Sequence, residues 1–169
     1  AHVPMADPVS ARLGEFAVHA AEPTGVRMHR AGTYVAIEGP QFSTRAESLM
    51  YRSWGCSVIG MTNMPEARLA REAELPYATI AMATDYDCWR EEEEGVSVTD
   101  VVRVLRENAS HARALITRIA QDMEAVERTP DPQGIETVLD HALITDPAAR
   151  DPALLARLDA VAGRVLRSS

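Results

Sequence analysis

A short apolar run that ends in two aspartates is the feature that most limits the folds open to this chain. Residues Tyr77–Ala83 are mostly apolar, follow Pro76, and lead directly into Thr84-Asp85-Tyr86-Asp87. A run of this length with such boundaries is typical of a buried strand. In open α/β sheets, ligands bind outside the carboxyl ends of strands, which is where Asp85 and Asp87 would lie. The run therefore predicts a ligand site at the end of a buried strand.

The two aspartates stand one residue apart, so the twofold period of a strand predicts that both side chains point to the same side. Such a pair can accept hydrogen bonds from N–H donors or take part in proton transfer. A metal site or a helix N-cap would use the same residue types. These two residues alone do not decide among the three interpretations, so other segments have to.

Strands and helices alternate along the rest of the chain. Short apolar runs predict the strands, and apolar residues at helical spacing predict the helices. The predicted strands are Val26–His29, Thr33–Ile37, Ser57–Met61 and Tyr77–Ala83, and the predicted helices are Pro8–Ala21, Thr44–Trp54, Pro65–Glu74, Thr99–Ala125, Ile135–Leu143 and Pro152–Leu166. This order favours an α/β fold with a mixed, largely parallel sheet flanked by helices.

The predicted organisation has two parts. Residues 1–125 hold all the predicted strands, and residues 126–169 form a helical extension interrupted by prolines. Three or four strands are fewer than the roughly five or six of a typical sheet, so we expect the chain to be a fragment or the partner of another chain. Thr44-Arg45-Ala46-Glu47 has the pattern of a capping box, which predicts a helix start. Glu91–Glu94 is an acidic tract of the kind that usually forms solvated surface.

Composition narrows the classes of function. A net charge of −8 argues against a general nucleic-acid or anionic-membrane surface. All 17 basic residues are arginine, so Schiff-base chemistry and a Walker-type phosphate loop are excluded. Cys56 and Cys88 are too few for a disulfide scaffold or a cysteine-built zinc site. With no signal peptide or membrane span visible, we expect a cytoplasmic protein. We also expect no metal site.

Two further segments stand at predicted strand ends. Gly39–Thr44 carries Phe42, and Gly60–Asn63 carries Met61 and Thr62. If their parent strands are neighbours of the strand before Asp85, the three segments converge on one pocket. An aromatic face, a soft apolar surface, a hydroxyl and two acceptors together suit a purine nucleoside. Taken singly, Phe42 and Met61 are as well explained as core residues, and Thr62 as a helix cap.

Three stretches in this order carry a resemblance to a known family. They are Gly32–Glu47, which reads GTYVAIEGPQFSTRAE, Gly60–Glu66, which reads GMTNMPE, and Ala83–Trp89, which reads ATDYDCW. Together they closely resemble the 5′-methylthioadenosine phosphorylase branch of the trimeric purine nucleoside phosphorylases. The resemblance covers roughly His2 to Met123, the carboxyl-terminal portion of that family's fold. Beyond about residue 126 we see no match.

The resemblance implies roles for the matching residues. Phe42 would lie against the base, Met61 at the sugar and Thr62 at phosphate. Asp85 would face N7 of the purine, and Asp87 would face its exocyclic amine.

Three more residues complete the implied substrate site. His2 matches a histidine that reaches into a neighbouring subunit's pocket near the 5′ substituent, and Thr84 and Ser43 join the substrate contacts. Relatives that act on 6-oxopurines carry Glu in place of Ser43 and Asn in place of Asp85. Because Ser43 can donate while Asp85 and Asp87 can accept, this sequence favours a 6-aminopurine. Burying a mismatched polar group costs about 1–3 kcal/mol, which is enough for tenfold selectivity.

The leaving group determines what the aspartates would do. When the glycosidic bond breaks, the ribosyl carbon becomes cationic and the purine anionic, so N7 must be protonated or hydrogen-bonded while phosphate waits on the opposite face. Asp85 is the candidate acid at N7. It must carry a proton in the complex, which burial and the nearby Asp87 carboxylate would favour.

The implied reaction is phosphorolysis of S-methyl-5′-thioadenosine to adenine and 5-methylthioribose 1-phosphate, with inorganic phosphate as co-substrate and no cofactor. The family's amino-terminal portion, with its Gly-rich phosphate loop and Arg-His pair, has no counterpart here. Thr62 alone cannot hold a phosphate dianion, so we expect the chain to be inactive by itself. Either a second chain supplies that half, or the chain was truncated or cleaved before His2.

Other functions are open at this stage. One is a purine nucleoside or methylthioinosine phosphorylase, and another is a catalytically silent subunit for nucleoside binding or assembly. A nucleoside hydrolase fits less well, because that chemistry usually needs an aspartate-rich calcium site. The family implies a homo-oligomer, either a trimer or a dimer of trimers, without nucleic-acid or membrane partners.

Overall fold

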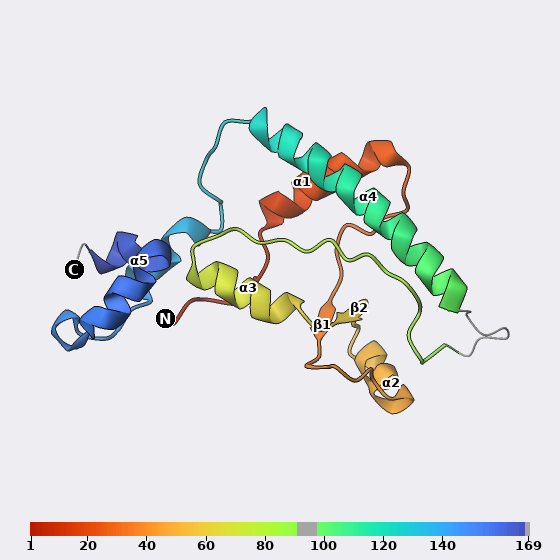
Figure 1. The fold of residues 1–169 in the computed structure, drawn as a ribbon, viewed down its shortest axis with the longest axis horizontal. Coiled ribbons are helices and arrows are strands. Elements are labelled where there is room, and N and C mark those ends of the chain that lie inside the picture. The colour runs from red at the N-terminus through yellow and green to blue at the C-terminus, as the bar shows by residue number, and fades with distance from the viewer. Residues whose placement is uncertain (91–97, 168–169) are drawn as a thin grey trace. The chain divides into compact units, whose positions relative to one another are not determined.

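The computed structural model describes residues 1–90 and 98–167 of the chain (Figure 1). Within these ranges the elements are mostly helical, with one small sheet. In chain order they are α1 (Ala11–Ala21), η1 (Glu22–Thr24), β1 (Tyr34–Ala36), α2 (Arg45–Ser53), β2 (Val58–Gly60), α3 (Asn63–Glu72), α4 (Val98–Glu124), η2 (Ile135–His141), η3 (Pro147–Ala149) and α5 (Pro152–Leu166). The fold class was therefore predicted correctly in its α/β character and its parallel pairing, but not in the size of the sheet.

The chain divides into two compact units, neither of which is continuous in sequence. The first unit comprises Ala1–Gly14, Met64–Ala78 and Arg128–Ser169, and the second unit comprises Glu15–Asn63 and Thr79–Glu127. The predicted boundary between residues 1–125 and 126–169 stays a prediction, since these units reflect packing and not sequence order.

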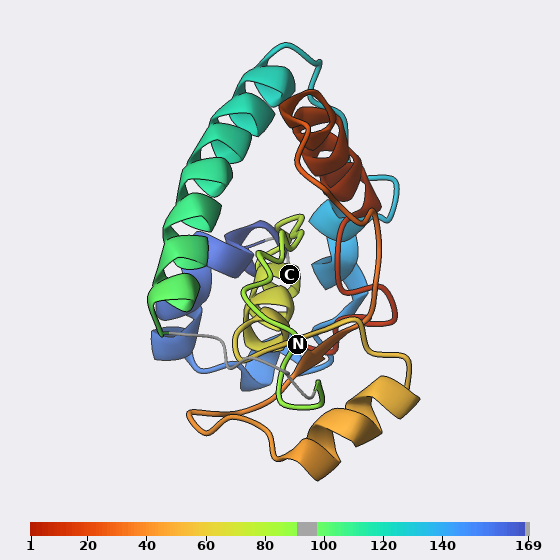
Figure 2. The same cartoon turned by 90° about the vertical axis from the view of Figure 1, so that its right-hand side faces the viewer.

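The sheet of the second unit has two parallel strands. Tyr34 lies opposite Val58, and Ala36 lies opposite Gly60. Helix α2 connects the end of β1 to the start of β2, as both views show (Figures 1 and 2). At the end of β2, a Cβ atom on Gly60 would lie 1.8 Å from the hydroxyl oxygen of Tyr34. The Tyr34 ring therefore packs on the strand backbone in a way that only glycine permits.

Two predicted strands are not strands in this structure. Val26–His29 and Tyr77–Ala83 join no ladder among the described residues. A strand needs a hydrogen-bonded neighbour, and the described chain pairs only β1 with β2. The Tyr77–Ala83 segment is also not a buried run, because Ile80 is 37% exposed. At its end the backbone bonds to a helix, because the Asn108 side chain of α4 donates to the Ala83 carbonyl over 3.0 Å.

The helices agree closely with the prediction. The Pro152–Leu166 helix is confirmed as α5 with the predicted bounds, and α4 begins one residue before the predicted Thr99 start. The predicted helical piece at Ile135–Leu143 is a 3₁₀ helix that ends at His141. The capping box is present, because the Thr44 hydroxyl accepts from the Glu47 N–H while the Glu47 carboxylate accepts from the Thr44 N–H. The acidic tract Glu91–Glu94 lies outside the described residues.

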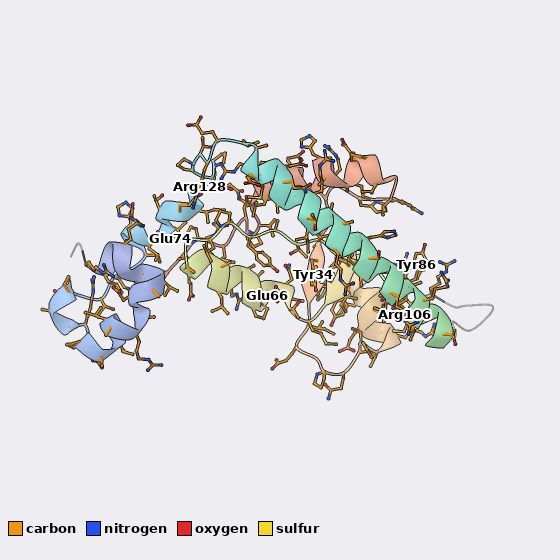
Figure 3. All side chains as sticks on the ribbon, turned by 45° about the horizontal axis from the view of Figure 1, so that its top comes forward. Tyr34, Glu66, Glu74, Tyr86, Arg106 and Arg128 are labelled. Carbon is orange, nitrogen blue, oxygen red and sulfur yellow. The ribbon has the colours of Figure 1, made fainter. Side chains whose placement is uncertain are left out.

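The first unit has its own core, in which η2 packs on α5. Leu139 and Ala142 are 2% exposed and Ala162 is 9% exposed. Glu74, just beyond the end of α3 (Figure 3), accepts from the Leu139 N–H over 3.0 Å and forms an ion pair with Arg164 of α5. The hydrogen bond to Glu74, and after it the one to Asp140, raises the pKa of the Arg164 guanidinium.

The long helix α4 keeps much of its apolar side exposed. Val102, Leu105, Ile116 and Met123 are between 39% and 61% exposed. The helical spacing of these residues predicts a side that faces a core, but the described part of the chain does not cover these side chains. No helix within the described ranges is long and apolar enough to cross a membrane.

Candidate active site

The loops that follow β1 and β2 meet at Gly39 and Met61. A Cβ atom on Gly39 would lie 2.5 Å from the Met61 sulfur, and Gly39 has a left-handed backbone with φ of 69°. The positive φ favours glycine at this position, and a larger residue would also displace the Met61 side chain. The predicted neighbourhood of the two strands is thus confirmed, since β1 pairs with β2 and their following loops are in contact.

Phe42 and Ser43 lie between β1 and α2 and differ in their surroundings. The Phe42 side chain is 88% exposed, so it is not part of a core in the described chain. The Ser43 hydroxyl oxygen is buried and has no hydrogen-bond partner among the described residues. Buried polar groups are nearly always paired, so an unpaired one calls for an explanation. The Ser43 hydroxyl can donate to or accept from a ligand, and it follows the exposed Phe42 in sequence.

The acidic segment forms a tight turn and not a strand end. The Asp85 carboxylate accepts from the Thr84 hydroxyl and from the Asp87 N–H, each over 2.8 Å. Asp87 has φ of 59°, an uncommon value for a residue other than glycine. Strand alternation therefore does not govern the two side chains, which are oriented by the bonds of the turn. Asp85 is exposed, and Asp87 is half-buried.

Two hydrogen bonds connect this turn to the start of α2. The Ser48 hydroxyl donates to Asp87 Oδ2 over 2.6 Å, and the Cys88 thiol donates to the Ser43 carbonyl over 3.4 Å. The Asp87 carboxylate also accepts from the Cys88 N–H over 2.8 Å. The segment after β1 and the acidic turn are thereby brought together, which the convergence hypothesis required.

The segment after β2 is linked to the chain before the turn. Thr79 donates its hydroxyl hydrogen to the Asn63 side-chain oxygen. Thr62, one residue before Asn63, is exposed and therefore accessible.

His2 belongs to the first unit, whereas the other seven predicted site residues belong to the second. Its backbone N–H donates to the Ala142 carbonyl over 2.9 Å, which anchors the start of the chain on η2. This bond is made within the first unit, to a residue of that unit's own core.

Charges near the turn come from α2 and from the residues after Cys88. The Arg52 guanidinium lies 3.6 Å from the centre of the Trp89 ring, and that of Arg90 lies 4.2 Å from the Tyr86 ring. At the start of α2, the Thr44 N–H holds the pKa of Glu47 below its ordinary value. No group of three or more His, Cys, Asp or Glu side chains in residues 1–90 and 98–167 is arranged to hold a metal ion.

Ser48 is the site contact that sequence reasoning missed. It is 2% exposed, and its partner Asp87 is 39 positions away. The sequence gives one weak signal, a polar residue in the first turn of a capped helix, and this signal cannot indicate which distant side chain it meets.

The chain is a fragment of a nucleoside phosphorylase-like fold, in which polar loops follow a parallel strand pair. The chain belongs to the phosphorylase superfamily, which it matches over residues 1–121. Within that superfamily the predicted resemblance to the 5′-methylthioadenosine phosphorylases is confirmed by individual relatives. The S-methyl-5′-thioadenosine phosphorylase of Bradyrhizobium diazoefficiens is 59% identical over 167 residues, which is 99% of this chain and 57% of that protein.

Solved structures support the same assignment. A methylthioadenosine phosphorylase from an antarctic soil metagenomic library is 40% identical with a TM-score of 0.86, over 95% of this chain and 56% of that one. A double mutant of the adenosine/methylthioadenosine phosphorylase of Schistosoma mansoni, in complex with adenine, is 33% identical with a TM-score of 0.75 over 85% of this chain and 56% of that one.

The extent of these matches bears on two expectations. The chain spans little more than half the length of the relatives it matches. The expectation of no match beyond about residue 126 is wrong, because the Bradyrhizobium protein matches over 99% of the chain. That expectation failed because it relied on strand-end motifs, and residues 126–169 contain none.

Proposed function

We propose that this chain is part of an enzyme that cleaves S-methyl-5′-thioadenosine with inorganic phosphate, giving adenine and 5-methylthioribose 1-phosphate. The remainder of the relatives' sequence, supplied by another chain or by a longer form of this one, would contribute the main phosphate contacts. The observation that carries the proposal is the acidic turn bonded to the start of α2, where Ser48 donates to Asp87 and Cys88 donates to the Ser43 carbonyl, next in sequence to the exposed Phe42. The similarity to methylthioadenosine phosphorylases supports it.

The proposed contacts follow the chemistry of each group. The exposed Phe42 ring offers a face on which a purine can stack. The unpaired Ser43 hydroxyl can donate to an acceptor nitrogen of the base, while the Asp87 carboxylate can accept from an exocyclic amine. This set matches adenine better than a 6-oxopurine, whose corresponding donor and acceptor are reversed.

Asp85 is proposed as the acid that hydrogen-bonds or protonates N7 as the glycosidic bond breaks. It is exposed in the described chain, so the bound purine and the rest of the protein would have to bury it. Met61 would contact the sugar, Thr84 the base side of the site, and Thr62 the phosphate. His2 would contact the 5′ substituent in a neighbouring subunit, which fits the proposed trimer or dimer of trimers.

The test uses this chain produced together with the missing portion of a relative's sequence, here called the assembled protein. We expect release of adenine from methylthioadenosine that depends on phosphate, with slower turnover of methylthioinosine. Faster cleavage of the inosine-type substrate would instead favour a 6-oxopurine phosphorylase. Adenine binding without any turnover would indicate a silent binding subunit. The chain alone serves as the control and should show no turnover.

A further inference from the structure

Ser48 is a buried residue of α2 whose hydroxyl meets the Asp87 carboxylate. Its oxygen lies 2.6 Å from Asp87 Oδ2, and the residue is 2% exposed. The other bonds of Asp87 come from adjacent positions, since its Oδ1 accepts from the Cys88 N–H and its own N–H donates to Asp85. Ser48 is thus the partner of this carboxylate that comes from a distant part of the described sequence.

Helix α2 fixes the position of the Ser48 hydroxyl. The Ser48 N–H donates to the Thr44 carbonyl over 3.0 Å, within the turn that the Thr44–Glu47 capping box stabilises. Asp87, by contrast, lies in a turn with a left-handed backbone of φ 59°. Such conformations persist where surrounding contacts hold them in place. Ser48 is therefore the rigid partner of this pair, and its hydrogen bond helps to fix the conformation of Asp87.

We propose that Ser48 is a positioning residue that orients the Asp87 carboxylate toward the purine and thereby contributes to base selectivity without touching the base. An ionised carboxylate offers about four acceptor sites. Ser48 and the Cys88 N–H occupy one site on each oxygen, which leaves acceptor sites on a fixed carboxylate for the amine of a 6-aminopurine. The inference rests on the proposed function, in which Asp87 binds that amine.

The experiment compares four versions of the assembled protein: wild type, Ser48→Ala, Asp87→Asn and the double variant. Ser53→Ala is the matched control, because Ser53 lies on the same helix and its hydroxyl donates to the Met50 carbonyl. Ser48→Ala should lower kcat/KM for methylthioadenosine by about 10- to 100-fold, the loss expected for a hydrogen bond to a charged group. It should also reduce the preference for adenine over hypoxanthine in binding, whereas Ser53→Ala should leave both unchanged.

The double variant separates positioning from a merely structural role. If Ser48 acts through Asp87, adding Ser48→Ala to Asp87→Asn costs little more than Asp87→Asn alone. Losses that multiply, or a Ser48→Ala protein that behaves like Ser53→Ala, would overturn the inference.

Adenine affinity, measured by calorimetry on the same proteins, keeps this test distinct from that of the proposed function. An assembled wild type that binds adenine but does not cleave methylthioadenosine contradicts the proposed activity, and adenine affinity then decides the role of Ser48. A wild type that binds no adenine overturns both.

Discussion

The two units of the chain use their side chains for different purposes. In the first unit, Leu139 and Ala142 are almost fully buried, and the Glu74 carboxylate ties that core to α5. In the second unit, the long-range contacts of the candidate site are hydrogen bonds between polar groups, such as the bond from Ser48 to Asp87. Apolar side chains of α4 such as Ile116, which is 61% exposed, remain open.

This contrast separates the contacts that stabilise the fold from the contacts that orient a group of the candidate site. Burial of Leu139 yields stability within the described chain, because apolar area is removed from water. The hydrogen bonds around Asp87 add little apolar burial, but they fix the direction of a group that can bind a ligand. Substitutions in the first unit should therefore affect stability first, and substitutions in the acidic turn should affect catalysis first.

The largest expected effect is on turnover. Asp85→Asn in the assembled protein should lower kcat for methylthioadenosine by about 10²- to 10⁴-fold, because an amide cannot deliver a proton to N7. The thermal midpoint should change little, since Asp85 is exposed and its partners Thr84 and the Asp87 N–H are local. Steady-state adenine release checks the first part, and a thermal melt checks the second.

The matched control lies in the first unit. Asp159→Asn alters a half-buried aspartate of α5, which pairs with Arg167 at the end of that helix, and should leave kcat unchanged. If Asp85→Asn retained wild-type turnover, or if both variants lost activity equally, the separation between the units would be wrong.

The next effect is on stability. Leu139→Ala should lower the free energy of unfolding of this chain by about 2–5 kcal/mol, because Leu139 is 2% exposed and its removal leaves a cavity under α5. Urea denaturation measures the change. Ile116→Ala, in the second unit, should alter stability by no more than about 0.5 kcal/mol in the same chain. Equal losses for the two variants would mean that the exposed side of α4 is covered after all.

Helices were easier to predict from the sequence than strands, for a physical reason. A helix closes its hydrogen bonds within its own segment, so the apolar spacing of Pro152–Leu166 and the capping box at Thr44 were sufficient to locate α5 and α2. A strand is completed by a neighbour. Tyr77–Ala83 has the composition of a strand, but no described segment pairs with it, and its sequence could not reveal that.

The candidate site shows the same division. The motifs correctly predicted that the loops after β1 and β2 lie together, because parallel neighbours end at the same edge of a sheet. They did not predict the turn at Asp87 or the buried partner Ser48, since both depend on contacts between distant segments. The roles of Phe42 and the other site residues stay predictions.

The smallest expected effect concerns the pH dependence of α2, which positions Ser48. The Thr44 N–H and then its hydroxyl lower the pKa of Glu47 from its ordinary value of 4.5, so the folded chain favours the ionised carboxylate. This contribution to stability is complete above the unfolded pKa and is lost as pH falls through the lower, folded value. The stability gap between wild type and Glu47→Gln should therefore be widest near neutral pH and should narrow as the solution is acidified below about pH 4.5, as measured by urea denaturation across that range.

Thr44→Val tests the assigned cause, because it removes the hydroxyl but keeps the backbone N–H, the larger of the two causes. It should lower stability by about 1 kcal/mol through loss of the cap at every pH. It should nevertheless keep most of the pH dependence that Glu47→Gln loses. Wild-type and Glu47→Gln curves that run parallel down to acid pH would show that the capping carboxylate does not contribute in this way, and that α2 is held by its packing alone.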